Sequence, residues 1–511
     1  MGFLPQQGNN PCMKRPHVHS QGVQKRPFRK YLRQSSAITV LTKIGEVRKI
    51  SDEMKRNETL TLTVLGGGGE VGANCFQLCY NGYQLLLDCG THPKKEGLDA
   101  LPEFALLSRS PNALIISHGH VDHCGAAPYL LRQFPGVRVY STLPTARVMD
   151  RMLHNSVAVM ETLARERGIS EYPLYDHEDV GYAMRSVRAY GFEESFFLGD
   201  DAEIEATFHH AGHVLGSASI LLRTPRHTLF YTSDICEIDQ ELMSGYTPLN
   251  GDVRVDTLVI ESTQGASDES AIYPYPQESA RLGESIRRVL KGGGSVLLPC
   301  FALGRTQEIL NIVARQQEEG IIPHVPIYVS GLGRAIYELY NRFYEYLAPG
   351  AVLRPLSQFQ RIGNLWEPGV VRRLIENPCI LVATSGMMME NTPSALIAQE
   401  MVRANHHGIF FVGYVDPDTL GYKLLHARPG DRLRFMLGHP AVEIKLENIK
   451  RLHFSAHANR AALRGIIERI KPRNVVYVHG DPDALAWMQH NSGNGYRSCT
   501  PGIGQTITLE N

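Results

Sequence analysis

The chain has 511 residues, of which 43% are hydrophobic and 20% are charged, and its formal net charge at pH 7 is zero. This length exceeds one ordinary hydrophobic core and predicts about three domain-sized units. No apolar run approaches the ~18 residues that a membrane span needs, and the neutral balance argues against a surface that is basic all over.

The nine cysteines are dispersed along the chain, without a CxxC pair or a short disulfide-type spacing. Such a set in a long chain is typical of reduced thiols. The basic N-terminus is not followed by an apolar stretch, so we expect no signal peptide. Together these features predict a cytoplasmic protein that does not span a membrane.

Residues 1–58 form the first predicted unit, a basic and flexible N-terminal arm. Residues 1–45 carry eight Lys or Arg and no acidic residue, and they are rich in Gln, Asn, Pro and Ser. A solvated tail and an arm that grips phosphates are both compatible with this composition. The composition does not choose between them.

The second unit, residues 59–265, mixes strands and helices. TLTLTVL alternates as a strand does, and CFQLCY and YQLLLD flank an NG turn as in a hairpin. Helices are predicted near PYLLRQF and over 144–168, and further strands at NALIIS, AEIEATFHHAG, ASILLRT, HTLFYTSD and VDTLVIES. This order predicts a layered α/β sandwich.

The third unit, residues 266–450, differs in the order of its predicted elements, because strands and helices now alternate. Predicted strands at SVLLP, VPIYVS, CILVATS and GIFFVGY are separated by helices, which include 276–291, 333–347 and SALIAQEMV. That alternation is typical of a parallel α/β unit. Residues 451–511 then supply strand-like LHFS, a helix, NVVYVHG and GQTITL, so the simplest fold is one α/β domain interrupted by another.

The motif SHGHVDHCG follows the apolar run ALIIS and predicts a metal centre. It contains His118, His120, Asp122 and His123. A strand projects alternate residues to one side, so His118 and His120 can face one ion. The next turn then brings Asp122 and His123 toward a second ion. Imidazole and carboxylate are the usual donors to zinc.

More ligands are needed for two ions, and the ends of predicted strands supply candidates. These candidates are His213 in AGHVLGS, Asp234 in LFYTSDI and His479 in VVYVHGD. A carboxylate such as Asp234 can bridge both ions. His209 and His210 are poorer candidates because of strand alternation and because no glycine loop follows them. Asp88, which ends LLLDCG, either fixes a histidine tautomer or caps a turn.

A series of motifs in this order resembles the β-CASP branch of the metallo-β-lactamase fold. The motifs are LGGGGEVGANC, ISHGHVDHCGAAPYL, AGHVLGS, YTSDI, VIESTQG, LPCFALGRTQE, ATSGMMM, GYVDPDTLG, HFSAHAN and VYVHGD. This family of RNA- and DNA-cutting nucleases includes the endonuclease subunit of the pre-mRNA 3′-end cleavage machinery and bacterial and archaeal relatives. The resemblance covers residues 59–511. It implies an αββα sandwich (59–265 and 451–511) that is interrupted by an inserted β-CASP domain (266–450).

The resemblance also implies a ligand set. One zinc would be held by His118, His120 and His213 and the other by Asp122, His123 and His479, with Asp234 shared. Zinc is the expected metal, and manganese is the alternative. Glu261, His457 and His479 fall on the three motifs that mark this branch, and a histidine at the third goes with its RNA-directed members.

This family assignment suggests a mechanism of RNA hydrolysis. Two ions about 3.5–4 Å apart lower the pKa of a bridging water and position the phosphate. We expect Asp122, Glu261 and His457 to be the catalytic side chains. In this scheme His457 protonates the leaving ribose oxygen or contacts the phosphate, and Glu261 orients the ring of His457.

The expected partner is single-stranded RNA. Ser385 and Gly386 lie in a small-residue turn whose backbone N–H groups can meet a phosphate. Arg305 follows a strand and is a further candidate for RNA binding, with a surface arginine at a helix start as its alternative.

The function predicted from the sequence is therefore a two-zinc ribonuclease for endonucleolytic RNA processing or decay. Two alternatives remain: a small-molecule hydrolase of the same fold, and a catalytically inactive β-CASP scaffold. The inserted unit argues against the first alternative and the intact ligands argue against the second. A homodimer is left open.

Overall fold

The structure is a computed structural model that describes residues 59–199, 203–267 and 273–509. The N-terminal arm predicted for residues 1–58 lies outside the described residues. Among the helices of the described part, none is both long enough and apolar enough to cross a membrane.

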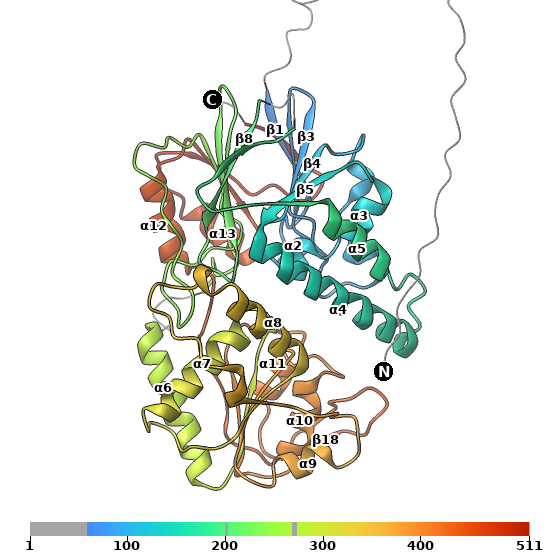
Figure 1. The fold of residues 1–511 in the computed structure, drawn as a ribbon, viewed down its shortest axis with the longest axis vertical. Coiled ribbons are helices and arrows are strands. Elements are labelled where there is room, and N and C mark those ends of the chain that lie inside the picture. The colour runs from blue at the N-terminus through green and yellow to red at the C-terminus, as the bar shows by residue number, and fades with distance from the viewer. Residues whose placement is uncertain (1–58, 200–202, 268–272, 510–511) are drawn as a thin grey trace, which may run out of the picture. The chain divides into compact units, whose positions relative to one another are not determined.

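Two seven-stranded sheets dominate the first part of the described chain (Figure 1). In spatial order the first sheet contains β22 (Thr506–Leu509), β1 (Leu60–Gly66), β2 (Cys75–Tyr80), β3 (Tyr83–Leu87), β4 (Ala113–Ile115), β5 (Arg138–Thr142) and β6 (Val187–Tyr190). The second contains β21 (Arg497–Cys499), β20 (Asn474–Val478), β11 (Thr257–Glu261), β10 (Thr228–Tyr231), β9 (Ala218–Arg223), β8 (Glu205–His210) and β7 (Ser195–Phe197). Strands from the C-terminal part of the chain thus complete both sheets.

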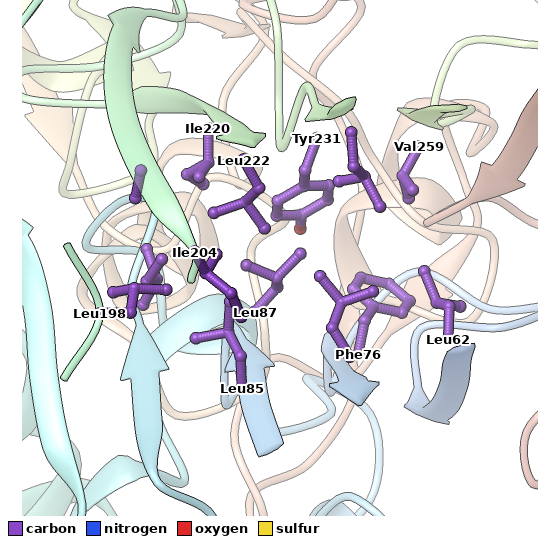
Figure 2. Packing of buried hydrophobic residues seen from close by; sticks show 14 of the residues in the cluster. Leu62, Phe76, Leu85, Leu87, Leu198, Ile204, Ile220, Leu222, Tyr231 and Val259 are labelled. Atoms are coloured by element: carbon purple, nitrogen blue, oxygen red, sulfur yellow. The ribbon is translucent and has the colours of Figure 1, made fainter. Parts of the chain in front are cut away.

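Apolar side chains from both sheets meet in one core (Figure 2). Leu62 and Phe76 from the first sheet face Tyr231 and Val259 from the second, and all four are buried. The rings of Phe76 and Tyr231 meet edge to face, with centroids 5.7 Å apart. Burial of each such side chain contributes about 1.5–3 kcal/mol, so this core holds the two sheets face to face.

Helices cover the outer face of each sheet. Helices α3 (Ala127–Gln133), α4 (Leu143–Arg167) and α5 (His177–Ser186) pack on the first sheet, and α12 (Arg460–Ile470) and α13 (Pro482–His490) pack on the second. The long helix α4 begins where the Thr142 side chain accepts a hydrogen bond from the Thr145 N–H, and it ends at Gly168, which has φ +70°. The architecture is the αββα sandwich that the sequence predicted.

A third, parallel sheet lies between β11 and β20 in the sequence. Its spatial order is β14 (Phe359–Arg361), β13 (Ile327–Val329), β15 (Ile380–Ala383), β12 (Val296–Pro299), β16 (Gly408–Phe411) and β19 (Ile449–Arg451). Helices α6 (Tyr275–Lys291), α7 (Arg305–Glu318) and α8 (Gly331–Arg342) pack on one face, and α9 (Val370–Leu374), α10 (Pro393–Met401) and α11 (Leu420–Leu425) pack on the other. Strands buried on both faces read as continuous apolar runs, as VLLP and ILVA do here. A small two-stranded sheet of β17 (Arg432–Leu433) and β18 (Val442–Glu443) adjoins this unit.

Two predicted elements differ from the structure. LHFS is not a strand, because β19 ends at Arg451 and the chain then turns toward the sandwich. The helix predicted over 333–347 ends at Arg342 and is followed by a separate 3₁₀ turn, Tyr344–Tyr346. In both cases the sequence pattern that predicted the strand or the helix extends beyond the residue at which the strand or helix ends.

Candidate metal centre and active site

The candidate site lies where parallel strands of both sheets end. Strands β10, β11 and β20 are parallel neighbours, so their carboxyl ends share one edge of the sheet. Asp234, Glu261 and His479 lie at or just after these three ends. Such edges are where α/β proteins collect functional side chains.

The HxHxDH motif lies opposite this edge, after β4. His118 and His120 are in the loop before the short helix α2 (Val121–Cys124), and Asp122 and His123 are in the helix itself. Gly90 makes this turn possible, because a Cβ at Gly90 would lie 1.7 Å from the Asp122 carbonyl oxygen. The four side chains divide between two clusters.

The first cluster contains His118, His120, His213 and Asp234. His120 Nδ1 lies 3.1 Å from His118 Nε2 and 3.1 Å from His213 Nε2. Asp234 Oδ2 lies 3.5 Å from the Nε2 atoms of both His118 and His213. Three imidazole nitrogens and one carboxylate oxygen therefore point at a common centre.

The second cluster contains Asp122, His123 and His479. Asp122 Oδ2 lies 3.8 Å from His123 Nε2 and 3.9 Å from His479 Nε2. Asp234 approaches this cluster with its other oxygen, since Oδ1 lies 3.3 Å from His123 Nε2 and 3.4 Å from His479 Nε2. The buried Asp234 carboxylate thus faces one cluster with each oxygen.

The donors fit metal ions in chemistry and in spacing. Two zinc-bound nitrogens at about 2.0–2.1 Å in tetrahedral geometry are roughly 3.3 Å apart, close to the nitrogen separations of the first cluster. Burial and then neighbouring imidazoles hold the pKa values of His118 and His213 well below their usual range, which keeps their lone pairs free. Asp234 Oδ1 is buried without a hydrogen-bond partner among the described residues. These His/Asp clusters are able to bind metal.

Hydrogen bonds fix the orientation of the rings. His123 Nδ1 donates to Asp88 Oδ2 at 2.8 Å, and His213 Nδ1 donates to the Ala456 carbonyl at 2.8 Å. A partner on Nδ1 selects the tautomer that presents Nε2 to a metal. Asp88 also accepts hydrogen bonds from the Ser117 N–H at 2.8 Å and the Tyr231 hydroxyl at 2.7 Å, so it orients a histidine and ties down the motif loop.

Glu261 and His457 form a pair beside the first cluster. His457 Nδ1 lies 3.1 Å and 3.0 Å from the two Glu261 oxygens, and 4.0 Å from Asp234 Oδ2. Burial disfavours the charged ring, but the Glu261 and Asp234 carboxylates outweigh it and raise the pKa of His457 to about 9. Glu261 is held in turn by the Ile235 N–H, which donates to Oε1 at 2.7 Å.

The predicted substrate-binding residues lie in the parallel unit, with Ser385 and Gly386 in the loop after β15 and Arg305 at the first position of α7. Ser385 and Gly386 follow β15, but α10 begins only at Pro393, so they do not form a helix N-terminus. A Cβ on Gly386 would lie 2.7 Å from the Phe301 nitrogen, which places this turn against the loop before α7. Arg305 is buried and its Nη2 donates to Gln240 Oε1, so its guanidinium is not presented to solvent.

Several residues around the site were given no role by the sequence analysis. Gln240 joins Arg305 to the loop of His213, because its Nε2 donates to the Gly212 carbonyl at 2.8 Å. The Leu303 carbonyl lies 3.4 Å from His120 Nε2, and Asn74 donates to the Asp122 carbonyl at 3.2 Å. His209 and His210 bond instead to Glu193 and the Gly245 carbonyl, and neither belongs to a cluster.

Three family models match the chain. The model of the metallo-beta-lactamase superfamily matches residues 68–265, that of the Beta-Casp domain matches 306–424, and that of the Zn-dependent metallo-hydrolase RNA specificity domain matches 441–492. The third span contains both His457 and His479.

Curated relatives and a solved structure agree with these models. The chain is 29% identical over 483 residues to cleavage and polyadenylation specificity factor subunit 3 of Dictyostelium discoideum, covering 91% of this chain and 59% of that protein. It is 28% identical to endoribonuclease YSH1 of Gibberella zeae, covering 85% of this chain and 54% of that protein. It is 29% identical to an RNase J-like protein of Methanocaldococcus jannaschii, covering 81% of this chain and 91% of that protein.

A crystal structure of a protein of unknown function from Enterococcus faecalis is similar in fold, with a TM-score of 0.51 and 16% identity, over 88% of this chain and 100% of that chain. The chain spans little more than half the length of two of the curated relatives. The sandwich, its His/Asp clusters and the inserted parallel unit define a metallo-β-lactamase-type protein. The chain contains a metallo-β-lactamase domain, a Beta-Casp domain and an RNA specificity domain.

Proposed function

We propose that this protein is a two-zinc ribonuclease that hydrolyses phosphodiester bonds in single-stranded RNA. One zinc would be held by His118, His120 and His213 and the other by Asp122, His123 and His479, with Asp234 between them. The observation that carries the proposal is the position of the Glu261–His457 pair, 4.0 Å from the shared Asp234. A buried carboxylate on one side of an imidazole leaves the other nitrogen free to act on a substrate.

The RNA specificity model supports RNA over a small substrate, because His457 and His479 fall within its span. Two relatives carry the name endoribonuclease or RNase J-like protein, which favours the same substrate class. Endonucleolytic cleavage, a cytoplasmic location, the choice of zinc over manganese, and a homodimer remain predictions from the sequence. The same holds for the limits of the domains at residues 58, 265 and 450.

The chain's own residues would act on both sides of the phosphate. Bound zinc supplies Lewis acidity toward the phosphate and activates a water for attack. His457, held by Glu261 through Nδ1, would donate the proton on Nε2 to the leaving ribose oxygen. The Asp122 side chain is 20% exposed, against 3% for Asp234, so Asp122 is the carboxylate of the clusters that would accept a proton from the attacking water.

A direct test compares three substrates on the metal-loaded protein: end-labelled single-stranded RNA, single-stranded DNA of the same sequence, and a chromogenic lactam. We expect cleavage of the RNA, at a rate that His457→Ala lowers by about 10²–10⁴-fold. A circular RNA, which has no ends, tests the endonucleolytic mode. Lactam turnover with intact RNA would support a small-molecule hydrolase, and no turnover at full metal occupancy would support an inactive scaffold.

A further inference from the structure

Helix α6 and the edge strand β19 carry a group of cations beside aromatic rings. The Arg281 guanidinium lies 4.1 Å from the centroid of the Tyr273 ring, and Lys450 Nζ lies 5.1 Å from that of Phe410. The side chains of Arg281 and Arg288 are 40% and 69% exposed, and Tyr273 is 47% exposed. We call Tyr273, Arg281, Arg288 and Lys450 the α6 patch.

The α6 patch concentrates positive charge. Arg281 and Arg288 are seven residues apart on one helix and therefore lie on the same face. Burial and then the charges of Arg288 and Arg281 lower the pKa of Lys450, so its ammonium group lies within the field of both guanidinium groups. Two acids offset part of this charge, since Glu278 forms an ion pair with Arg281, and Glu284 Oε1 lies 3.6 Å from Arg288 Nη2.

The patch adjoins the segment of chain that leads to the candidate active site. Glu278, one turn before Arg281, accepts a hydrogen bond from the backbone N–H of His453. Lys450 precedes His457 by seven residues, which limits their separation to about 25 Å even for a fully extended chain. A strand of several nucleotides that is held at His457 can therefore reach the α6 patch.

We propose that the α6 patch is a second binding surface for the RNA strand, outside the cleavage site. This proposal rests on the proposed ribonuclease function. Arg288 and Lys450 would bind phosphates, and the exposed part of the Tyr273 ring would stack on a base. A surface with an aromatic ring between cations suits single-stranded RNA better than it suits an acidic protein. A nucleic acid strand offers bases and phosphates in alternation, and an acidic protein offers only negative charge.

The first experiment compares Arg288→Gln/Lys450→Gln with the wild type. RNAs of about 30 and about 5 nucleotides are tested, so that only the longer one spans both surfaces. Binding is measured by fluorescence anisotropy at several salt concentrations. We expect the slope of log K against log salt for the long RNA to flatten by about 1.4, since each lost contact with a single strand contributes about 0.7. Affinity for the short RNA and its cleavage rate should not change.

The matched control is Arg372→Gln/Arg373→Gln on α9, which also removes two positive charges. The side chains of Arg372 and Arg373 are 76% and 61% exposed. We expect this control to leave the slope at the wild-type value. Tyr273→Ala should weaken binding of the long RNA by roughly tenfold, while Tyr273→Phe, which keeps the ring, should not.

Identical slopes for the α6 variant and the α9 control would overturn the second surface, and so would equal losses for the long and the short RNA. In either case wild-type cleavage of the short RNA would leave the proposed function intact. A wild-type protein that binds and cleaves neither RNA would instead contradict the proposed function.

Discussion

Two buried carboxylates in this protein, Asp234 and Glu308, differ in charge although neither is accessible to water. Burial acts on both by opposing ionisation. For Asp234, His123, His479 and His457 outweigh that effect and hold the pKa well below its usual range. For Glu308, the charge of Arg305 and the Leu242 N–H offset burial only in part, and the pKa is raised to about 7.

The groups that surround each carboxylate explain the difference. Asp234 lies within 3.5 Å of four imidazole nitrogens, two on each oxygen. Glu308 receives only neutral donors at one oxygen, the Leu242 N–H at 3.0 Å and the Tyr275 hydroxyl at 3.3 Å. Its other oxygen has no hydrogen-bond partner among the described residues. A buried acid is thus held ionised by neighbouring histidines in one place, while in the other burial opposes its ionisation.

Neutral isosteres of the two acids should give the largest contrast. We expect Asp234→Asn to lose metal from both clusters and to abolish RNA cleavage, because an amide cannot offer a charged oxygen to two ions. Glu308→Gln should retain the wild-type metal content. The check is the ratio of metal to protein after gel filtration, with the exposed Asp252→Asn as a control. Full metal occupancy in Asp234→Asn would contradict a shared ligand.

Substitution of His457, which lies near Asp234, distinguishes a role in metal binding from a role in the cleavage step. We expect His457→Ala to lower the rate of RNA cleavage by about 10²–10⁴-fold with unchanged metal content, since a general acid contributes on that scale. Glu261→Gln should lower the rate in the same direction, because it removes the charge that keeps the His457 ring protonated. His490→Ala, on the exposed end of α13, is the control. A parallel loss of metal would assign His457 to the clusters instead.

The two buried acids also differ in how far the sequence reveals them. Asp234 follows a strand, so local pattern and metal chemistry made it a candidate ligand, and the family resemblance implied the histidines that would share its site. Asp88 was expected either to fix a histidine tautomer or to cap a turn, and in the structure it contacts His123. Site geometry built from consecutive strand ends is therefore largely predictable.

The environment of a residue that forms hydrogen bonds with another unit of the chain could not be predicted from the sequence. Arg305 was expected to bind RNA from its place after a strand, but its environment depends on Gln240, 65 positions earlier in the chain. Gln240 matches no motif, and Glu308 ends the motif LPCFALGRTQE without any sign of its partner, the Leu242 N–H. The burial of both side chains arises only when the parallel unit packs against the sandwich. Short strands such as β6 and β7, with exposed positions, lack the apolar alternation that identifies a strand.

The smallest effect should be the pH dependence of stability that Glu308 contributes. Its pKa is about 7 in the folded protein and about 4.5 when exposed, so between these values the folded state keeps a proton that the unfolded state has lost. The free energy of unfolding of the wild type should therefore fall relative to Glu308→Gln as pH rises from about 4.5 to about 7, and then remain constant. The total difference should be at most about 3 kcal/mol.

Urea unfolding of both proteins at a series of pH values measures this difference, because contributions from the remaining acids and histidines cancel between the wild type and the variant. Glu338→Gln, an exposed position on α8, should run parallel to the wild type. A wild type that loses stability relative to Glu308→Gln as pH falls would mean that Glu308 is ionised in the folded protein. Arg305 would then stabilise Glu308 as the histidines stabilise Asp234, and the contrast between the two acids would not hold.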